Sequence, residues 1–138
     1  MRSMTLLLGG LALAASAMAA GLPPERQAGG VSYVSGGVSA DEAEAFKAMR
    51  NNYPLAIELV QQVGGRNMFT ADAKVRVMDS AGHVVLDARA DGPFMLVRLP
   101  PGRYRVEATF KGMTTESPAT VNIGGHAQAT LNFPGSPD

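Results

Sequence analysis

Hydrophobic and polar residues alternate along most of the chain from residue 55 onward, with the period of two that a half-buried β-strand shows. LAIELVQ, the first such stretch, places Leu55, Ile57 and Leu59 on one face. The most regular stretch is RYRVEATFK, 103–111, where arginine, glutamate, threonine and lysine fall on the outward face. Its inward face is apolar throughout: Tyr104, Val106, Ala108 and Phe110.

Further segments of this kind complete the predicted fold. AKVRVMD directs Val75 and Val77 inward, and HVVLDA follows the turn DSAG as its hairpin partner. PFMLVRL is apolar on both faces, which is typical of a central strand. ATVNI and AQATLNF end the series. The pattern predicts a mainly β fold, an antiparallel β-sandwich of seven short strands separated by turns.

One short N-terminal amphipathic helix is predicted within SADEAEAFKAMRNN, before Pro54. Ser39 and Glu42 have the spacing of a capping box, in which each side chain accepts a backbone N–H. The apolar residues recur at intervals of three: Ala43, Phe46 and Met49. We expect this stripe to pack on the protein's own sheets, with docking of a partner as the alternative.

The first residues, 1–19, read as a cleavable signal peptide. Arg2 precedes an apolar run over residues 6–17, and Ala17 and Ala19 form a small-x-small cleavage site. A retained membrane anchor is the alternative, but the run is shorter than the about 20 apolar residues of a spanning helix and contains two glycines. The expected location is therefore the periplasm or the exterior, with no stable membrane insertion after cleavage.

The rest of the chain divides by composition. Residues 20–38 are rich in glycine, proline and serine, which predicts a flexible leader with room for a short strand at 31–34. The helix and the sandwich form one domain, 39–134, and residues 135–138 form a disordered tail. Cysteine is absent, so neither a lipid anchor nor a disulfide is available. Twelve basic and twelve acidic residues give no net charge, which argues against nucleic-acid binding.

A Pro-Pro-Gly turn precedes the most regular strand. Pro101 fixes φ at the second position of the turn, Gly102 is expected to take the positive φ of a type II turn, and Pro100 begins it. The hydroxyl of Tyr104 is expected to bind backbone at this corner, as in the tyrosine corner of sandwich domains. We therefore interpret these four residues as structural.

From about 70 to 133 the sequence resembles the carboxypeptidase regulatory-like domain, a transthyretin-like β-sandwich. The residues that carry the resemblance are the Asp-Gly turn at 91–92 before a buried strand, the run LPPGRY at 99–104, and Gly112 after the next strand. Pro93 departs from the pattern. The segment 32–60 is similar to the front half of small exported bacterial proteins of unknown function that carry this domain alone. The resemblance implies a non-catalytic module.

A basic patch is the main candidate for binding. Arginine side chains suit carboxylate or phosphate groups, and five cations are predicted near the outer face beside the turn. They are Arg89, Arg98, Arg103, Arg105 and Lys111. The alternative is a solvated strand face that discourages edge pairing.

Catalytic, metal and cofactor motifs are not recognised. His83 and His126 each follow glycine in a predicted turn, and no G-x-S-x-G elbow occurs. Methionines occur singly, and the aspartates at 79, 87 and 91 lack the dense spacing of a calcium loop. Hydroxyisourate hydrolase shares the transthyretin-like fold and ends in Tyr-Arg-Gly-Ser, but this chain ends LNFPGSPD.

These observations favour a non-catalytic periplasmic module that binds another envelope protein or a surface component. A binder of small ligands or carbohydrate, using the loops at one end of the sandwich, is the alternative. The aromatic residues predicted to be free for a carbohydrate are Tyr33, Tyr53 and Phe69. A hydrolase is the third hypothesis.

Overall fold

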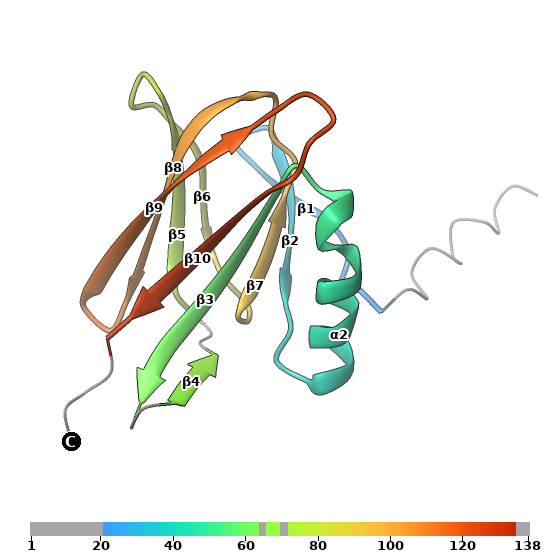
Figure 1. Ribbon diagram of the computed structural model, residues 1–138, viewed down its shortest axis with the longest axis vertical. Helices are drawn as coiled ribbons and strands as arrows, with labels where there is room; N and C mark the ends of the chain where they lie inside the picture. Colours follow the sequence, from blue (N-terminus) through green and yellow to red (C-terminus); the bar gives the residue numbers. More distant parts are fainter. Residues whose placement is uncertain (1–20, 64–65, 70–71, 135–138) are drawn as a thin grey trace, which may run out of the picture.

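The computed structural model describes residues 21–63, 66–69 and 72–134, so the predicted signal peptide and C-terminal tail lie outside the described residues. Figure 1 shows two β-sheets with one helix against the outer side of one of them. The N-terminal half contains β1 (Arg26–Ala28), β2 (Val31–Gly36), helix α2 (Ala40–Met49), the 3₁₀ turn η1 (Arg50–Asn52), β3 (Leu55–Val63) and β4 (Arg66–Phe69). The C-terminal half contains β5 (Lys74–Asp79), β6 (Val84–Arg89), β7 (Phe94–Val97), β8 (Gly102–Phe110), β9 (Met113–Val121) and β10 (Ala127–Phe133).

The strands form one six-stranded and one four-stranded sheet. The larger sheet has the order β1-β2-β7-β3-β10, with β4 paired to β3, and the smaller has the order β6-β5-β8-β9. The prediction of a mainly β chain with one short helix is confirmed, and each predicted strand is present. The number seven is wrong, because β1, β2 and β4 add to the larger sheet.

Two of the added strands, β1 and β2, lie in the leader, residues 20–38. The leader was predicted to be flexible, and this prediction is wrong for residues 21–38, the part that the structure describes. β2 begins where the short strand was expected and pairs along β7, from Tyr33 opposite Val97 to Gly36 opposite Phe94. Val34 is fully buried. The leader is ordered because its strand β2 pairs with β7. The content of glycine, proline and serine does not predict this pairing.

The purely antiparallel arrangement is also wrong at one position, because β10 pairs with β3 in parallel. The chain leaves the smaller sheet at the end of β9, turns through a Gly125 N–H to Asn122 carbonyl hydrogen bond of 2.9 Å, and enters the larger sheet. There the N–H of Ala127 donates to the carbonyl of Pro54 at 2.8 Å, which fixes the start of both strands at the same level.

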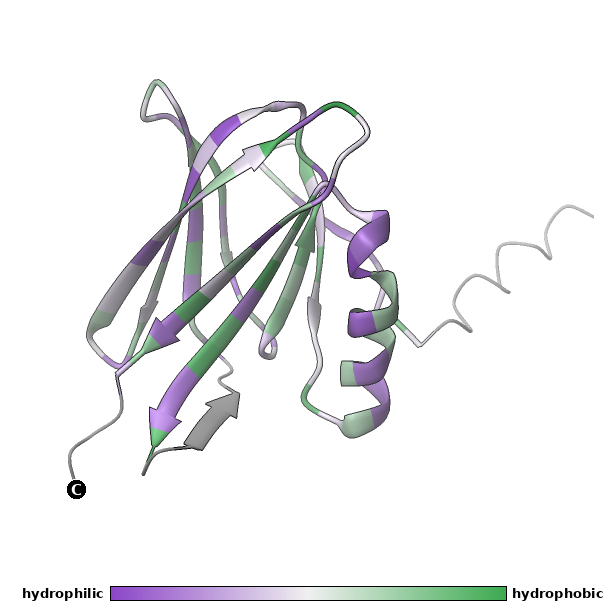
Figure 2. Cartoon of the chain, viewed as in Figure 1, coloured by the Kyte–Doolittle hydropathy of each residue, from purple (hydrophilic) through white to green (hydrophobic). Residues whose placement is uncertain are grey.

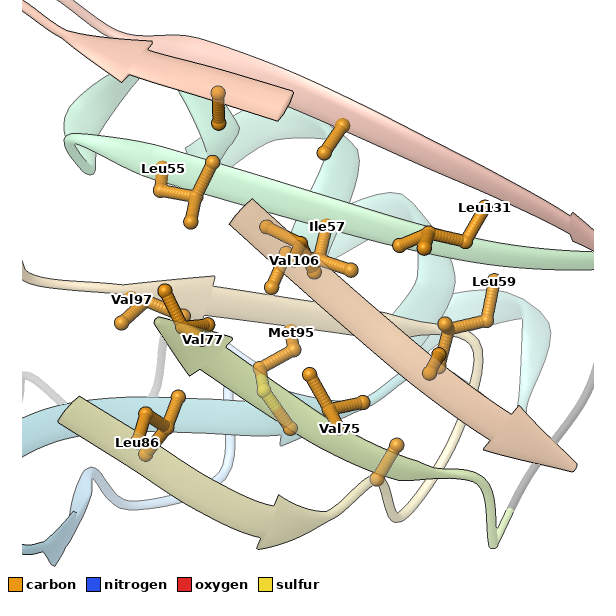
Figure 3. Close-up of a cluster of buried hydrophobic side chains, with 14 of the residues drawn as sticks. Leu55, Ile57, Leu59, Val75, Val77, Leu86, Met95, Val97, Val106 and Leu131 are labelled. Carbon is orange, nitrogen blue, oxygen red and sulfur yellow. The ribbon is translucent and has the colours of Figure 1, made fainter. Parts of the chain in front are cut away.

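The main core lies between the two sheets. Leu55, Ile57 and Leu59 of β3 are buried in it, as predicted, and they face Val75 and Val77 of β5 (Figure 3). Hydrophobic and hydrophilic residues alternate along the strands in Figure 2, which reflects one face turned to this core and one to the outside. The alternation read from the sequence therefore places these strands correctly.

β7 has apolar side chains on both faces, as predicted for a central strand. Met95 and Val97 enter the core between the sheets, whereas Phe94 and Leu96 face helix α2. The ring of Phe46 stacks on that of Phe94, with centroids 5.7 Å apart. The helix stripe thus packs on its own domain, as expected. No helix among the described residues is long and apolar enough to cross a bilayer.

The helix N-terminus carries half of the predicted capping box. The hydroxyl of Ser39 accepts the N–H of Glu42 at 3.2 Å, as expected. The carboxylate of Glu42 does not return to the N–H of Ser39; its Oε1 accepts the N–H of Gly37 at 2.6 Å. The side chain therefore fastens the end of β2 to the helix.

A tight backbone crossing joins the C-terminal end of β2 and the turn before β7. The buried hydroxyl of Ser35 donates to the carbonyl of Phe94 at 3.1 Å and accepts the N–H of Asp91 at 2.9 Å. A Cβ on Gly92 would lie closer than 3.0 Å to the carbonyl group of Gly36. Only glycine fits at this crossing.

We predict that Gly92→Ala lowers the free energy of unfolding by about 1–3 kcal/mol, because backbone must move to admit the methyl group. Urea unfolding measures the change. Gly82→Ala is the control, since its Cβ meets nothing within 4 Å and only its φ of +88° opposes the substitution. A loss in Gly92→Ala no greater than that in Gly82→Ala would contradict the crossing.

Candidate functional site

The structure brings together two of the five cations in the predicted patch. Arg103 and Arg105 lie near the start of β8, exposed on the outer face of the four-stranded sheet. Lys111 follows the far end of β8, about 27 Å away at about 3.4 Å per residue. Arg89 ends β6 at that far end. Arg98 lies in the loop between β7 and β8, on the side of the helix.

Arg103 and Arg105 line an open groove of about 490 Å³, here called the Arg103 groove. Its lining residues are Met78, Asp79, Ser80, Gly82, Arg103, Tyr104, Arg105 and Pro118. Arg105 pairs with Glu116 at 2.9 Å across to β9. Within the described part of the chain, the side chain of Arg103 has no hydrogen-bond or ion-pair partner. Its guanidinium is therefore available to a ligand.

One wall of the Arg103 groove is the turn between β5 and β6. Oδ1 of Asp79 accepts the N–H groups of Ala81 and His83, at 3.0 and 2.9 Å, which closes the turn. The hydrogen bond from the His83 N–H is the main reason that the pKa of Asp79 lies below its usual value. This carboxylate is consequently occupied by its own turn, which leaves Arg103 as the free charge in the groove.

The Pro-Pro-Gly corner directly precedes Arg103 in the chain, and its structure was predicted in part. The hydroxyl of Tyr104 donates to the carbonyl of Pro100 at 2.6 Å, so the expected bond to backbone is confirmed. Burial and the charge of Asp79 raise the pKa of Tyr104. The type II turn is wrong, because Gly102 has φ 158° and pairs with Val121 as the first residue of β8. Strand pairing extends the backbone there, where a type II turn requires a φ near +80°.

Arg98 belongs to a separate cluster with Glu25 and Tyr53. Its Nη2 lies 2.9 Å from Oε2 of Glu25, and its guanidinium carbon lies 4.4 Å above the centre of the Tyr53 ring. The Tyr53 hydroxyl donates to the same carboxylate oxygen at 2.7 Å. The hydrogen bonds from Arg98 and then Tyr53 lower the pKa of Glu25. The cluster fastens the leader to the end of the sheet.

A second groove, of about 440 Å³, lies beside this cluster and is here called the loop-end groove. It is formed by the η1 turn and the start of β3, the β7–β8 loop and the β9–β10 turn. Its lining residues are Asn51, Asn52, Tyr53, Pro54, Arg98, Leu99, Pro101, Val121, Asn122, Ile123, Gly124 and Gly125. The sequence analysis did not single out these asparagines, although the runs NNYP and NIGG both predict turns.

Two of the three aromatic residues expected to be free for a carbohydrate are not free. Tyr33 and Tyr53 are buried, and Arg98 covers one face of the Tyr53 ring. The third, Phe69, has no described side-chain surroundings. A flat aromatic platform is therefore not the basis on which either groove would bind a ligand.

The histidines are not assembled into a catalytic arrangement within the described residues. Nδ1 of His83 lies 3.5 Å from the carboxylate of Asp79, but no hydroxyl group hydrogen-bonds to this ring. His126 is exposed in the β9–β10 turn. Asp91 is engaged with Arg26 in an ion pair. In the same ranges, no three side chains of the usual metal-binding types gather into a group.

We predict that Tyr53 makes stability sensitive to alkaline pH. Burial and then the hydrogen bond to Glu25 raise its pKa to about 12 from the ordinary 10.0. Neutral tyrosine is favoured in the folded state, so this contribution is complete below about pH 10 and is lost as pH rises towards about 12. The free energy of unfolding should therefore fall more steeply over this range in the wild type than in Tyr53→Phe.

The measurement is urea unfolding of both proteins at several pH values. Tyr104→Phe is a matched control, because Tyr104 lacks the bond to Glu25 and its burial is less complete. Equal slopes for the wild type and Tyr53→Phe would show that Tyr53 ionises as it does in the unfolded chain.

No protein-family model matches the chain, and a comparison with curated proteins finds no match. The resemblance to the carboxypeptidase regulatory-like domain therefore rests on the sequence motifs alone. The structural features that bear on function are the Arg103 groove and the loop-end groove. Both lie near the start of β8: Arg103 lines the first, and Val121, which pairs with Gly102, lines the second.

Proposed function

We propose that the protein is a non-catalytic binding module of the transthyretin-like β-sandwich type, exported to the periplasm, where it binds an acidic segment of another envelope protein. The order of the Asp-Gly turn, the buried strand and the run LPPGRY supports the fold assignment. Two facing sheets around one core are compatible with it. The expected cleavage after residue 19 supports export.

The observation that carries the proposal is the unpartnered guanidinium of Arg103 in an open groove. Two other arginines of the outer sheet face are paired: Arg76 with Glu107 at 3.2 Å and Arg105 with Glu116 at 2.9 Å. A free arginine next to a paired one can take a carboxylate in the bidentate manner that its planar group favours. Arg105 can then share its charge between Glu116 and the incoming group.

The non-catalytic assignment is supported by the same groove. Ser80 and His83 both belong to its turn, yet no hydrogen bond joins the serine hydroxyl to the histidine ring in the described structure. Oδ1 of Asp79 accepts two backbone N–H groups and Oδ2 lies 3.5 Å from Nδ1 of His83, so the carboxylate and the ring belong to the same turn. These groups close a turn and do not activate a nucleophile.

We predict that replacing Arg103 and Arg105 together by alanine reduces partner capture from envelope extract at least about tenfold, since two charge-assisted contacts are lost. Both side chains point outward and the core is untouched, so the thermal midpoint should stay nearly unchanged. Capture is measured by quantitative mass spectrometry, and it should also fall as salt rises.

The matched control replaces Arg89 and Lys111 by alanine, which removes the same charge from the opposite end of the sheet. This variant should still capture the proteins that the wild type captures. If both double variants lose them equally, net charge and not the groove is responsible. If neither variant loses them, the Arg103 groove is not the binding surface.

A further inference from the structure

The loop-end groove is a second candidate site, independent of the proposed interaction at Arg103. We propose that it binds a short neutral saccharide. Its volume of about 440 Å³ falls within the range of about 300–1,000 Å³ of small-ligand pockets. Three segments far apart in the sequence form its walls, and the chemistry of those walls defines the ligand.

The walls are held in place before any ligand arrives. Tyr53 is fixed by its hydrogen bond to Glu25 and by the guanidinium of Arg98 above its ring. The N–H of Arg98 donates to the carbonyl of Ser32 at 3.0 Å, which ties the β7–β8 loop to β2. A backbone hydrogen bond closes the β9–β10 turn. A preformed groove spares the ligand the cost of ordering these loops.

Three amide side chains supply the polar contacts. Asn51, Asn52 and Asn122 are exposed and line the groove, and their side-chain amides have no hydrogen-bond partner among the described residues. Each carboxamide offers two donors and an acceptor oxygen. A sugar hydroxyl both donates and accepts, so adjacent hydroxyl groups of one ring match such amides.

The charge of the groove favours a neutral ligand. Arg98 is the one ionised side chain among its lining residues, and the carboxylate of Glu25 already accepts its Nε and Nη2 groups, at 3.1 and 2.9 Å. The remaining lining residues are uncharged. The binding free energy of an anionic ligand would therefore be less favourable here than at Arg103. A cation would not interact with the amides more favourably than it does with water.

Apolar side chains complete the lining. Ile123 is 89% exposed at the tip of the β9–β10 turn. Leu99 and Pro101 line the same groove. Sugar rings carry C–H faces that pack on such surfaces, and covering Ile123 removes apolar area from water. A fully hydroxylated, uncharged ring satisfies both kinds of contact.

The test is NMR titration of the folded domain with maltotriose, cellotriose and triacetylchitotriose at about 10 mM, above the roughly 1 mM Kd of a weak site. We expect at least one of them to shift the side-chain amides of Asn51, Asn52 and Asn122. Combining Asn52→Ala with Asn122→Ala should weaken binding at least about tenfold, because two hydrogen-bonding groups are lost. Ile123→Ser should weaken it separately.

Gln128→Ala with Asn132→Ala is the matched control, since both amides lie exposed on the outer face of β10 and outside the groove. It should bind as the wild type does. The Arg103→Ala, Arg105→Ala variant should also bind the saccharide normally, so failure of the envelope interaction leaves this result unaffected.

Three results would overturn the proposal. One is the absence of shifts with all three saccharides. Another is binding that survives loss of the two asparagines while their variant remains folded. The third is a stronger response of the same amides to trialanine, which would assign the groove to a neutral peptide.

Discussion

The burial of β7 on both faces is the constraint on which the other elements depend. Its four residues lie between β2 and β3 in the larger sheet, with Met95 and Val97 in the core between the sheets. Phe94 and Leu96 form the floor on which helix α2 packs. A strand buried on both sides needs a partner at each edge and a cover for each face, because unpaired backbone groups are costly away from water. β2, β3, the smaller sheet and the helix meet these needs.

The same strand positions the candidate sites. Where β7 ends, the loop that leads to β8 contributes Arg98, Leu99 and Pro101 to the loop-end groove, and the first residues of β8 line the Arg103 groove. The Arg103 groove has the free charge of Arg103, and the loop-end groove has the amides around Asn122. The two grooves differ in electrostatics for a simple reason: Glu25 is bound to Arg98, whereas no acidic residue of the described structure binds Arg103. The region near the start of β8 thus offers an anion-binding surface and a neutral polar one.

Much of the fold could be predicted because side-chain periodicity records which face of a strand is buried. The alternation over 103–111 and the apolar run of β7 both gave correct placements. Periodicity does not show which strands pair. The parallel pairing of β3 with β10 and the ordered structure of the leader were therefore not predicted. The candidate sites were less predictable. The alternation along β8 correctly predicted that Arg103 and Arg105 point outward. Arg98 was predicted to belong to the same patch, but it pairs with Glu25, which is far away in the sequence. Asn52 and Asn122 are far apart in the sequence, and only the fold brings them into the lining of one groove.

The central claim is that β7 joins the helix layer and both sheets into one cooperative unit. Native-state amide hydrogen exchange at increasing urea concentrations tests it most directly, because it gives an opening free energy and a urea dependence for each amide. We expect the amides of β7 and those at the centre of β8 to open with the same free energy and the same urea dependence, since both need global unfolding. A lower free energy and a smaller urea dependence for β7 would mean that the helix and its strand detach alone, which would contradict the account.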